Sequence, residues 1–265
     1  MNYADIDTLF VNFICFMLIL MRITGAFFLA PVFGSSRVLK RLKVWIAVFI
    51  SFVILPTLIN KTAITPDISF PIFVVYGIKE IIIGFIFGWF SNMPFQATRI
   101  GAEIAGRMSG FGIGRVINPD VDENVSLLTQ YVYIIVVLLF LTFDGHHMII
   151  KILSRSFEYI PLGKNAFSPK LTDIAIKFYS YVFNRGIAYG APVLGLLIII
   201  SCGMGIANKA IPDLNVMMLA FPIRVFVGVA GTMFLFPFAL ILLKKVMFLT
   251  EKYSNALILH MSGGI

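Results

Sequence analysis

The amino-acid sequence predicts an all-α, membrane-associated protein with about six long, apolar, kinked helical segments arranged as hairpins. Composition is the first reason: 59% of the 265 residues are hydrophobic and only 13% are charged. A soluble domain has roughly 45–50% apolar and about 25% charged residues. The second reason is that the apolar residues cluster into six long runs. No segment is polar enough to form a separate soluble domain, so we expect a single domain over residues 1–265.

A helix needs roughly 20 apolar residues to cross the hydrocarbon core of a bilayer, and the length of each apolar run can be compared with this number. They lie at residues 9–33, 44–59, 68–97, 125–143, 186–207 and 214–243. The second run is short for a crossing, whereas the third and the sixth are long enough to bend or double back. Before the fifth run, Ser168-Pro169 has the pattern of a helix start, with serine as N-cap and proline in the first turn. We expect one long helix from there through the fifth run, bent at Pro192.

Prolines lie inside or at the edges of several runs: Pro31, Pro56, Pro71, Pro94, Pro192, Pro222 and Pro237. Each proline removes a backbone donor and tends to kink or break a helix. In lipid, broken backbone is tolerated only where protein or a cavity shelters it. We therefore expect interrupted helices that face other helices, in a fold built to pack in a helical hetero-oligomer.

Basic residues give conflicting indications of the membrane topology. The loop 37–43 holds four of them and should be cytoplasmic by the positive-inside rule. With six simple crossings the region 151–185 would lie on the opposite side, yet it holds six basic residues against two acidic ones. Either some runs are hairpins that do not cross, or the chain does not sit in lipid as a conventional bundle. The net charge of +8 is dispersed between apolar runs, so it does not predict a nucleic-acid partner.

Small residues recur at the four-residue spacing that lets membrane helices approach closely. They include Gly84 and Gly88, Ala97 with Gly101 and Ala105, and Gly186 with Gly190. We expect most of them to pack helices of this chain against one another.

The segment 106–119, GRMSGFGIGRVINP, is rich in glycine yet remains apolar. Glycine permits positive φ and close backbone approach, and Asn-Pro disfavours continued helix. Such a segment between membrane-type helices suits a closure element: a gate, a plug or a selectivity constriction. The alternative is a packed connection between two helices. The candidate plug residues are Gly106, Met108, Gly110, Phe111, Gly112, Ile113, Gly114, Asn118 and Pro119.

Four charged residues lie well inside apolar runs, where a charge costs at least about 2.5 kcal/mol on insertion scales. They are Arg22, Lys79, Glu80 and Arg224. Their signs and similar depth suggest that Arg22 pairs with Glu80, either to fix helix register or as part of a proton or ion path. The sequence contains no catalytic motif, so we expect no catalytic residue, no cofactor and no metal site. We interpret Asp144, His146 and His147 as a structural turn at a helix end.

Four blocks of sequence together resemble the FliR family of flagellar export-gate subunits, which is related to the SctT subunit of injectisomes. The first block is Arg22-Ile-Thr-Gly25 with Ala30-Pro31-Val-Phe, and the second is Glu80 with Gly84, Gly88, residues 105–111 and Asn118-Pro119-Asp120. The third block is FDGHHMIIKILSRSFEYIPLG at residues 143–163. The fourth runs from Ala191-Pro192 through residues 205–216 to Phe221-Pro222. They span nearly the whole chain in the expected order.

The resemblance implies an all-helical subunit in which residues 1–125 are similar to FliP and residues 126–265 end in a FliQ-like hairpin. Such subunits complete a FliP–FliQ–FliR channel, raised above the plane of the membrane, for unfolded flagellar proteins, and the segment 106–119 would be its plug. Implied partners are FliP, FliQ, FlhB, FlhA and membrane lipid, in the inner membrane at the flagellar basal body. A subunit-packing turn is implied at Lys209, Pro212, Asp213, Asn215 and Pro222, where Lys209 replaces a usual arginine and Asp213 a usual glutamine.

The main alternative function is a polytopic secondary transporter of a small solute. Its interrupted helices would hold the solute near the bilayer midplane. A transporter of that kind should show inverted repeats between its halves, and none is apparent in this sequence.

Overall fold

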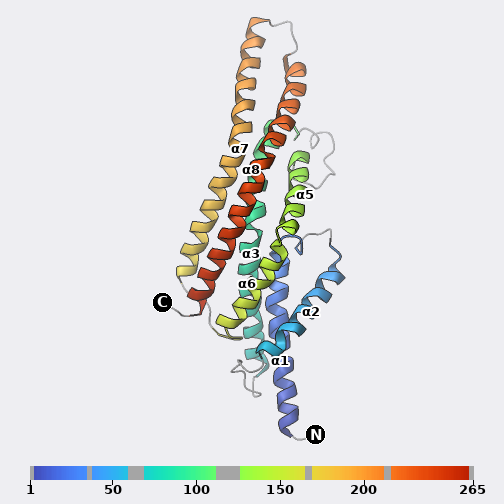
Figure 1. Cartoon of the computed structure of the whole chain (residues 1–265), viewed down its shortest axis with the longest axis vertical. Coiled ribbons are helices and arrows are strands. Elements are labelled where there is room, and N and C mark those ends of the chain that lie inside the picture. Colours follow the sequence, from blue (N-terminus) through green and yellow to red (C-terminus); the bar gives the residue numbers. More distant parts are fainter. Residues whose placement is uncertain are drawn as a thin grey trace. The chain divides into compact units, whose positions relative to one another are not determined.

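The computed structural model describes residues 3–34, 38–58, 69–111, 126–164, 169–211 and 216–262. All regular structure in these ranges is helical (Figure 1), which confirms the predicted all-α class. The helices are α1 (Tyr3–Leu29), α2 (Lys40–Leu58), α3 (Phe70–Met108), α5 (Leu127–Thr142), α6 (Gly145–Tyr159), α7 (Lys170–Ala210) and α8 (Val216–Met261).

Helices α3, α7 and α8 are longer than the apolar runs that predicted them. Helix α7 is the single long helix expected through the fifth run. Helices α3, with 39 residues, and α8, with 46, are each continuous, so of the two alternatives predicted for these runs, a bend or a doubling back, the doubling back is excluded. Helix α6 was not predicted, because charged residues such as Lys151 and Arg155 interrupt its apolar positions.

Five prolines lie inside continuous helices, so the expected interruptions at these positions are wrong, except at Pro192, where one long helix was expected. They are Pro56, Pro94, Pro192, Pro222 and Pro237. A proline deletes one backbone hydrogen bond of its helix. In apolar surroundings any further opening would leave more backbone groups unpaired at several kcal/mol each. Continuing the helix through the proline is therefore the lower-energy solution.

Five of the described helices are long and apolar enough to cross a membrane, or six if α5 and α6 count as one broken span. Their length and composition fit the predicted membrane class. In the most apolar 18-residue windows of α7 and of α8 only 17% of the residues are buried within the chain. Much of their apolar surface is therefore left for lipid or for other proteins.

The chain divides into two compact units, each made of separate segments. Unit 1 comprises Met1–Met93, Asp144–Phe178 and Phe248–Ile265, and unit 2 comprises Pro94–Phe143 and Tyr179–Met247. Unit 1 therefore contains α1, α2, the first part of α3, α6, the start of α7 and the end of α8. Within it, α2 packs mainly against α1 and also touches α6.

The core of unit 1 combines aromatic stacking with close backbone packing. The Phe178 ring stacks on Phe90 of α3 at 5.3 Å and on Tyr253 of α8 at 4.8 Å between ring centroids. Between α1 and α3, a Cβ added at Gly84 or Gly88 would strike backbone atoms of α1. These two glycines therefore pack helices of the same chain, as predicted.

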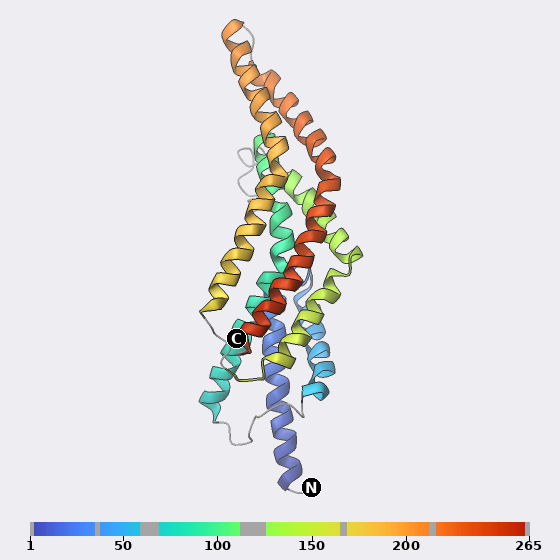
Figure 2. The same cartoon turned by 60° about the vertical axis from the view of Figure 1, so that its left-hand side comes forward.

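Unit 2 contains the rest of α3, α5 and most of α7 and α8. Helices α7 and α8 run in opposite directions (Figures 1 and 2). Helices α3 and α7 cross where Gly101 meets Gly186 and Gly190. A Cβ at Gly101 would lie 2.7 Å from the Gly186 carbonyl oxygen, and one at Gly190 would lie 2.7 Å from that of Gly101. The predicted small-residue spacing thus also describes this crossing.

Candidate functional site

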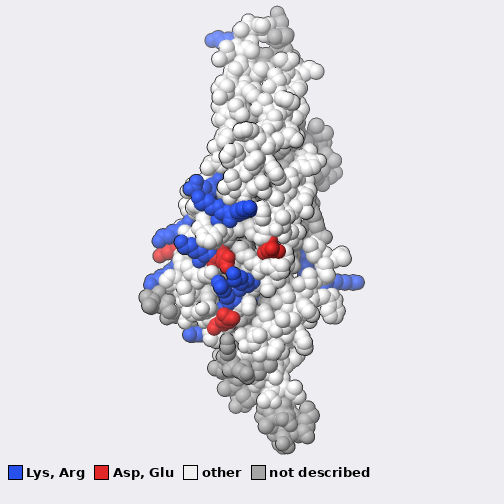
Figure 3. All heavy atoms as spheres, viewed as in Figure 1, with Lys and Arg blue, Asp and Glu red and all other residues white. Residues whose placement is uncertain are grey.

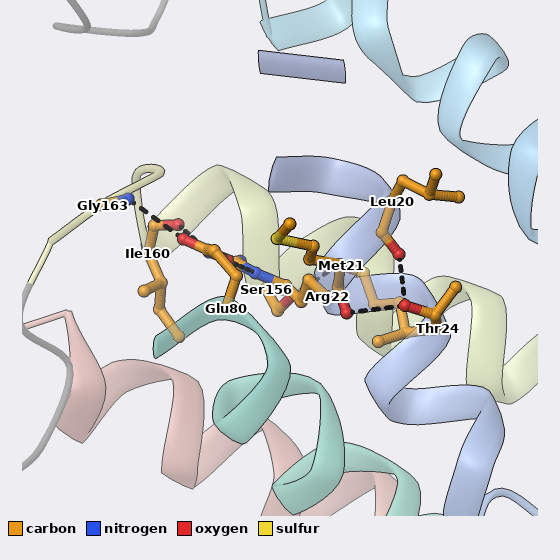
Figure 4. Close-up of polar contacts among 9 residues, drawn as sticks. Leu20, Met21, Arg22, Thr24, Glu80, Ser156, Ile160 and Gly163 are labelled. Carbon is orange, nitrogen blue, oxygen red and sulfur yellow. Dashed lines mark hydrogen bonds and ion pairs between the residues drawn. The ribbon is translucent and has the colours of Figure 1, made fainter. Parts of the chain in front are cut away.

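The first candidate site is a buried ion pair in unit 1 between Arg22 of α1 and Glu80 of α3 (Figure 4). Arg22 Nε donates a hydrogen bond to Glu80 Oε2 at 2.5 Å, and both side chains have no exposed surface. The pair expected from the sequence is therefore present. A Cβ added at Gly84, four residues after Glu80, would strike the backbone of Arg22. The glycine lets the two helices approach closely enough for the side chains to meet.

The remaining polar atoms of the pair are also used, by α6 and the turn that follows it. Arg22 Nη1 donates to Ser156 Oγ at 3.3 Å, and Nη2 donates to the Ile160 carbonyl at 3.1 Å. The second oxygen of Glu80 accepts the Gly163 N–H at 3.0 Å (Figure 4). Gly163 has φ of 78°, a conformation that favours glycine. The cluster thus joins α1, α3 and α6.

The electrostatics of this cluster favour a structural role. Ile160 is the C-cap of α6, so the Arg22 guanidinium meets the negative end of that helix. The guanidinium also lies 4.3 Å from the centre of the Phe157 ring, a favourable cation–π distance. Removing one partner of a buried pair typically costs about 3–5 kcal/mol. Since the hydrogen bonds of the pair are made within the protein, the geometry favours fixed helix register over a proton or ion path.

The other two charges expected inside apolar runs are only half-buried. Lys79 Nζ lies 5.6 Å from the Tyr76 ring centre. Arg224 of α8 has a buried Nε without a hydrogen-bond partner among the described residues. In the expected subunit-packing turn, Lys209 is exposed in the last turn of α7 and Pro222 is exposed within α8. The other expected residues of that turn lie outside the described residues: Pro212, Asp213 and Asn215.

The second candidate site is the end of α3, where the expected plug begins. Gly110 has φ of 90° and donates its N–H to the Arg107 carbonyl at 3.2 Å. The Phe111 N–H donates to the Gly106 carbonyl, also at 3.2 Å. This hydrogen-bond pattern, with glycine in the left-handed region, is a Schellman cap. Gly110 therefore ends the helix, which is a definite structural role for a residue predicted as part of a plug.

The side chains at this cap differ in exposure. Phe111 is half-buried and packs against the hydrophobic cluster of unit 2 that contains Ala105 and Val193. The Met108 side chain is 39% exposed. The remaining predicted plug residues lie outside the described residues: Gly112, Ile113, Gly114, Asn118 and Pro119.

A polar node that the sequence analysis missed ties the end of α3 to the start of α5. Glu103 Oε2 accepts hydrogen bonds from Thr129 Oγ1 at 2.7 Å and from the Ser126 N–H at 3.3 Å. Ser126 is the N-cap of α5, and its hydroxyl accepts the Thr129 N–H. Gly106 packs directly on the Ser126 side chain. The described residues on either side of the segment 112–125 are therefore held to each other. The signal for this in the sequence was Ser126, a residue type favoured at helix N-caps, at the start of the apolar run 125–143.

The side chains of Asp144, His146 and His147 converge at the start of α6, with potential ligand atoms within 4.8 Å of one another. Asp144 takes the left-handed conformation, with φ of 53°, just before the helix. Its Oδ1 lies 3.2 Å from His147 Nδ1. The left-handed turn before α6 brings the aspartate and His147 together, which fits the predicted structural turn at a helix end. Both are largely exposed, and this contact has the geometry of a surface hydrogen bond.

Comparison with known proteins gives similarity over most of the chain. The family model described as "Bacterial export proteins, family 1" matches residues 13–249. The chain is 28% identical to the flagellar biosynthetic protein FliR of Escherichia coli K12 over 215 residues, which cover 80% of each chain. It is 25% identical to the FliR of Buchnera aphidicola subsp. Acyrthosiphon pisum over 263 residues, 98% of each. The secretion system apparatus protein SsaT of Salmonella typhimurium is 23% identical over 162 residues, 61% of this chain and 62% of that protein.

Proposed function

Because this chain belongs to family 1 of the bacterial export proteins, we propose that it is the FliR-type subunit of a flagellar type III export gate. The observation that carries the proposal is the family match over residues 13–249, together with flagellar relatives aligned over about four fifths of their length or more. The coarser assignment, a membrane protein of a type III export apparatus, follows from the family and from the apolar helices. The family match favours export over the transport of a small solute.

In the proposed assembly the chain completes a channel with FliP and FliQ subunits and works with FlhA and FlhB in the inner membrane at the flagellar basal body. Its first part, 1–125, is the FliP-like half, and the α7–α8 pair is the FliQ-like hairpin. Unfolded flagellar proteins are the cargo. Support comes from the large apolar surface of α7 and α8 that the chain itself leaves uncovered, since such a surface needs lipid or protein partners.

We propose in addition that residues 112–119 supply a steric plug. Support comes from the described residues nearest to the segment on either side: the Schellman cap at Gly110 ends α3, and the Glu103 node holds Ser126, at the start of α5, to α3. A loop fastened in this way can be displaced by a cargo chain and then return. The apolar side chain of Ile113 within the segment, and that of Met108 at the end of α3 before it, suit an obstruction that also excludes water and ions.

The assembly is tested by tagging the full chain in its own bacterium, solubilising the membranes and identifying the co-purifying proteins. FliP and FliQ should co-purify, and deletion of the gene should abolish hook and filament export. A deletion strain that still exports hook protein would contradict the assignment, as would a chain that purifies alone and binds a small solute.

The plug is tested separately by deleting residues 112–114, which leaves the cap at Gly110 intact. Cells carrying this variant should leak ions while the subunit still assembles with its partners. The matched control is Gly195→Ala, at a helical glycine with no neighbouring atom within 4 Å of an added Cβ. Unchanged ion conductance in a correctly assembled deletion variant would contradict the plug but not the assignment as an export subunit.

A further inference from the structure

The C-terminal end of α3 is held on two sides within unit 2. On one side Gly106 packs on Ser126, the N-cap of α5. On the other side Ser109 packs on Gly228 of α8. Both views show the end of α3 against the α7–α8 hairpin (Figures 1 and 2). The contact between Ser109 and Gly228 therefore joins the end of α3 to α8.

This contact depends on the absence of a side chain at Gly228. A Cβ added there would strike both Oγ and Cβ of Ser109, whereas Ser109 Cα would lie 3.6 Å away, an ordinary van der Waals distance. Ser109 has no exposed surface, and its hydroxyl donates to the Ala105 carbonyl at 2.6 Å. Turning the hydroxyl aside would leave it buried without a partner, which is costly. A side chain at position 228 must therefore push the end of α3 away from α8.

The contact directly precedes the segment proposed as the plug. Gly110, the residue after Ser109, has φ of 90° and ends α3 in the Schellman cap. Phe111 follows and packs on the same hydrophobic cluster as Val229 of α8. The backbone from Ser109 to Phe111 is thus fixed by hydrogen bonds and by α8. A displacement of Ser109 consequently moves the point at which the segment 112–119 begins.

The helix that makes this contact is left largely uncovered by the chain. In the most apolar 18-residue window of α8, 17% of the residues are buried within the chain. Helix α8 has no charged residue between Arg224 and Lys244, and α7 has none between Arg185 and Lys209. Figure 3 shows a large surface almost without charge. Such a surface marks an interaction site, so the position of α8 depends on what packs against it.

We propose that Ser109 and Gly228 are positioning residues for the plug: through their contact, α8 sets where the segment 112–119 begins. The inference rests on the plug proposed for that segment. An α8 that is held by its partners keeps the end of α3 in place, and a shift of α8 by the width of a methyl group displaces it. The barrier to ions is thus coupled to the packing of the hairpin, through two residues that lie outside the segment itself.

The proposal is tested with the full chain assembled into gates in its own bacterium. The ion leak is measured with a membrane-potential dye, and assembly is measured by co-purification of the other subunits. In Gly228→Ala the crowded contact should displace the end of α3, and the leak per assembled gate should rise about tenfold. A factor of ten corresponds to about 1.4 kcal/mol, which lies within the usual cost of overpacking.

Two double variants show whether the contact itself is responsible. Ser109→Gly with Gly228→Ala moves the Cβ from one side of the contact to the other, so the leak should return to within about twofold of the wild type. Ser109→Ala with Gly228→Ala keeps the Cβ of residue 109, which the new methyl group would strike. This second pair should leak as much as Gly228→Ala alone.

The matched control is Gly231→Ala, one turn further along α8. Its new Cβ would lie 2.9 Å from Cγ2 of Val193. It therefore crowds α7 against α8 but does not touch α3. Gly231→Ala should leave the leak unchanged, which separates displacement of the plug from a general loss of helix packing.

The outcomes distinguish this inference from the plug itself. If deletion of residues 112–114 causes a leak but assembled Gly228→Ala gates do not, the positioning role is wrong and the plug stands. If the deletion causes no leak, both are wrong. Equal leaks from Gly228→Ala and Gly231→Ala, or equal rescue by the two double variants, would also overturn the positioning role.

A further variant decides the question if Gly228→Ala does not assemble. Ser109→Gly leaves a gap in place of a clash and frees the backbone before Gly110, so its leak should rise about threefold. A Ser109→Gly gate that assembles and is as tight as the wild type would then overturn the proposal.

Discussion

Helix α3 carries two carboxylates, Glu80 and Glu103, and they lie in opposite environments. Glu80 has no exposed surface and pairs with a fully buried Arg22. Glu103 keeps 21% of its side chain exposed and pairs with Arg107, which is 62% exposed and belongs to the same helix. Both carboxylates also accept a backbone N–H from a distant segment, Gly163 for Glu80 and Ser126 for Glu103.

The difference in burial means that the contacts of Glu80 are permanent, whereas the contacts of Glu103 can open and close. A buried pair is costly to break because one charge is left without water or a partner. An exposed pair contributes about 0–1 kcal/mol, because water takes over when it opens. The cluster around Glu80 is therefore suited to holding α1, α3 and α6 in one register. The node around Glu103 is suited to the base of a segment that moves, as the plug proposed above would.

The largest effect is expected when the buried pair loses one partner. Arg22→Met leaves the Glu80 charge buried without its cation, which should cost about 3–5 kcal/mol. The expected result is a large fall in the amount of folded chain in membranes. The melting temperature in detergent, measured by tryptophan fluorescence, should also fall.

The double variant Arg22→Met with Glu80→Met is the control for this change. It removes both charges, so it should recover part of the lost stability; the Ile160 carbonyl and the Gly163 N–H still lose their partners. A single variant as stable as the wild type would show that the pair does not hold the three helices.

A smaller effect is expected from the glycine that lets the pair form. In Gly84→Ala the new Cβ would strike the backbone of Arg22 and of Ala26, so α1 and α3 must separate at a cost of about 1–3 kcal/mol. At Gly195, within α7, an added Cβ meets no atom within 4 Å. Gly195→Ala should therefore raise stability by about 0.5–1 kcal/mol. Equal melting temperatures for the two alanine variants would contradict the close helix contact.

Much of the fold follows from the sequence because its signals are local. Apolar runs of membrane length, and small residues four apart such as Gly84 and Gly88, predicted the helices and their close contacts. Prolines such as Pro94 and Pro237 were misleading: a helix that continues through a proline loses one hydrogen bond, whereas a full break in apolar surroundings would leave more backbone groups unpaired. Helix α6 was missed because its charged residues gave an amphipathic helix the sequence pattern of a polar loop.

The candidate site was predicted only in part, because its contacts are not local. Arg22 and Glu80 stood out as charges in apolar runs, and opposite signs sufficed to pair them. Nothing in the sequence indicated that Ser156 and Gly163 complete that cluster, since they lie more than 70 residues beyond Glu80. Gly110 was predicted as one of the glycines of the plug segment, because the sequence alone does not separate a helix cap from a flexible loop.

The smallest effect on stability is expected from a change at Glu103. Glu103→Gln keeps an oxygen that can accept from Thr129 and Ser126 but removes the charge next to the start of α5, at a cost of about 1 kcal/mol. The melting temperature should therefore change little. Trypsin cleavage within the segment 112–125, which contains Arg115, should rise about fivefold, because the rate follows the population of the opened ends. Arg107→Gln removes only the exposed ion pair and should stay within about twofold of the wild type. If Glu103→Gln instead lowered the melting temperature as much as Arg22→Met, the two carboxylates of α3 would be equivalent anchors and the distinction drawn between them would be wrong.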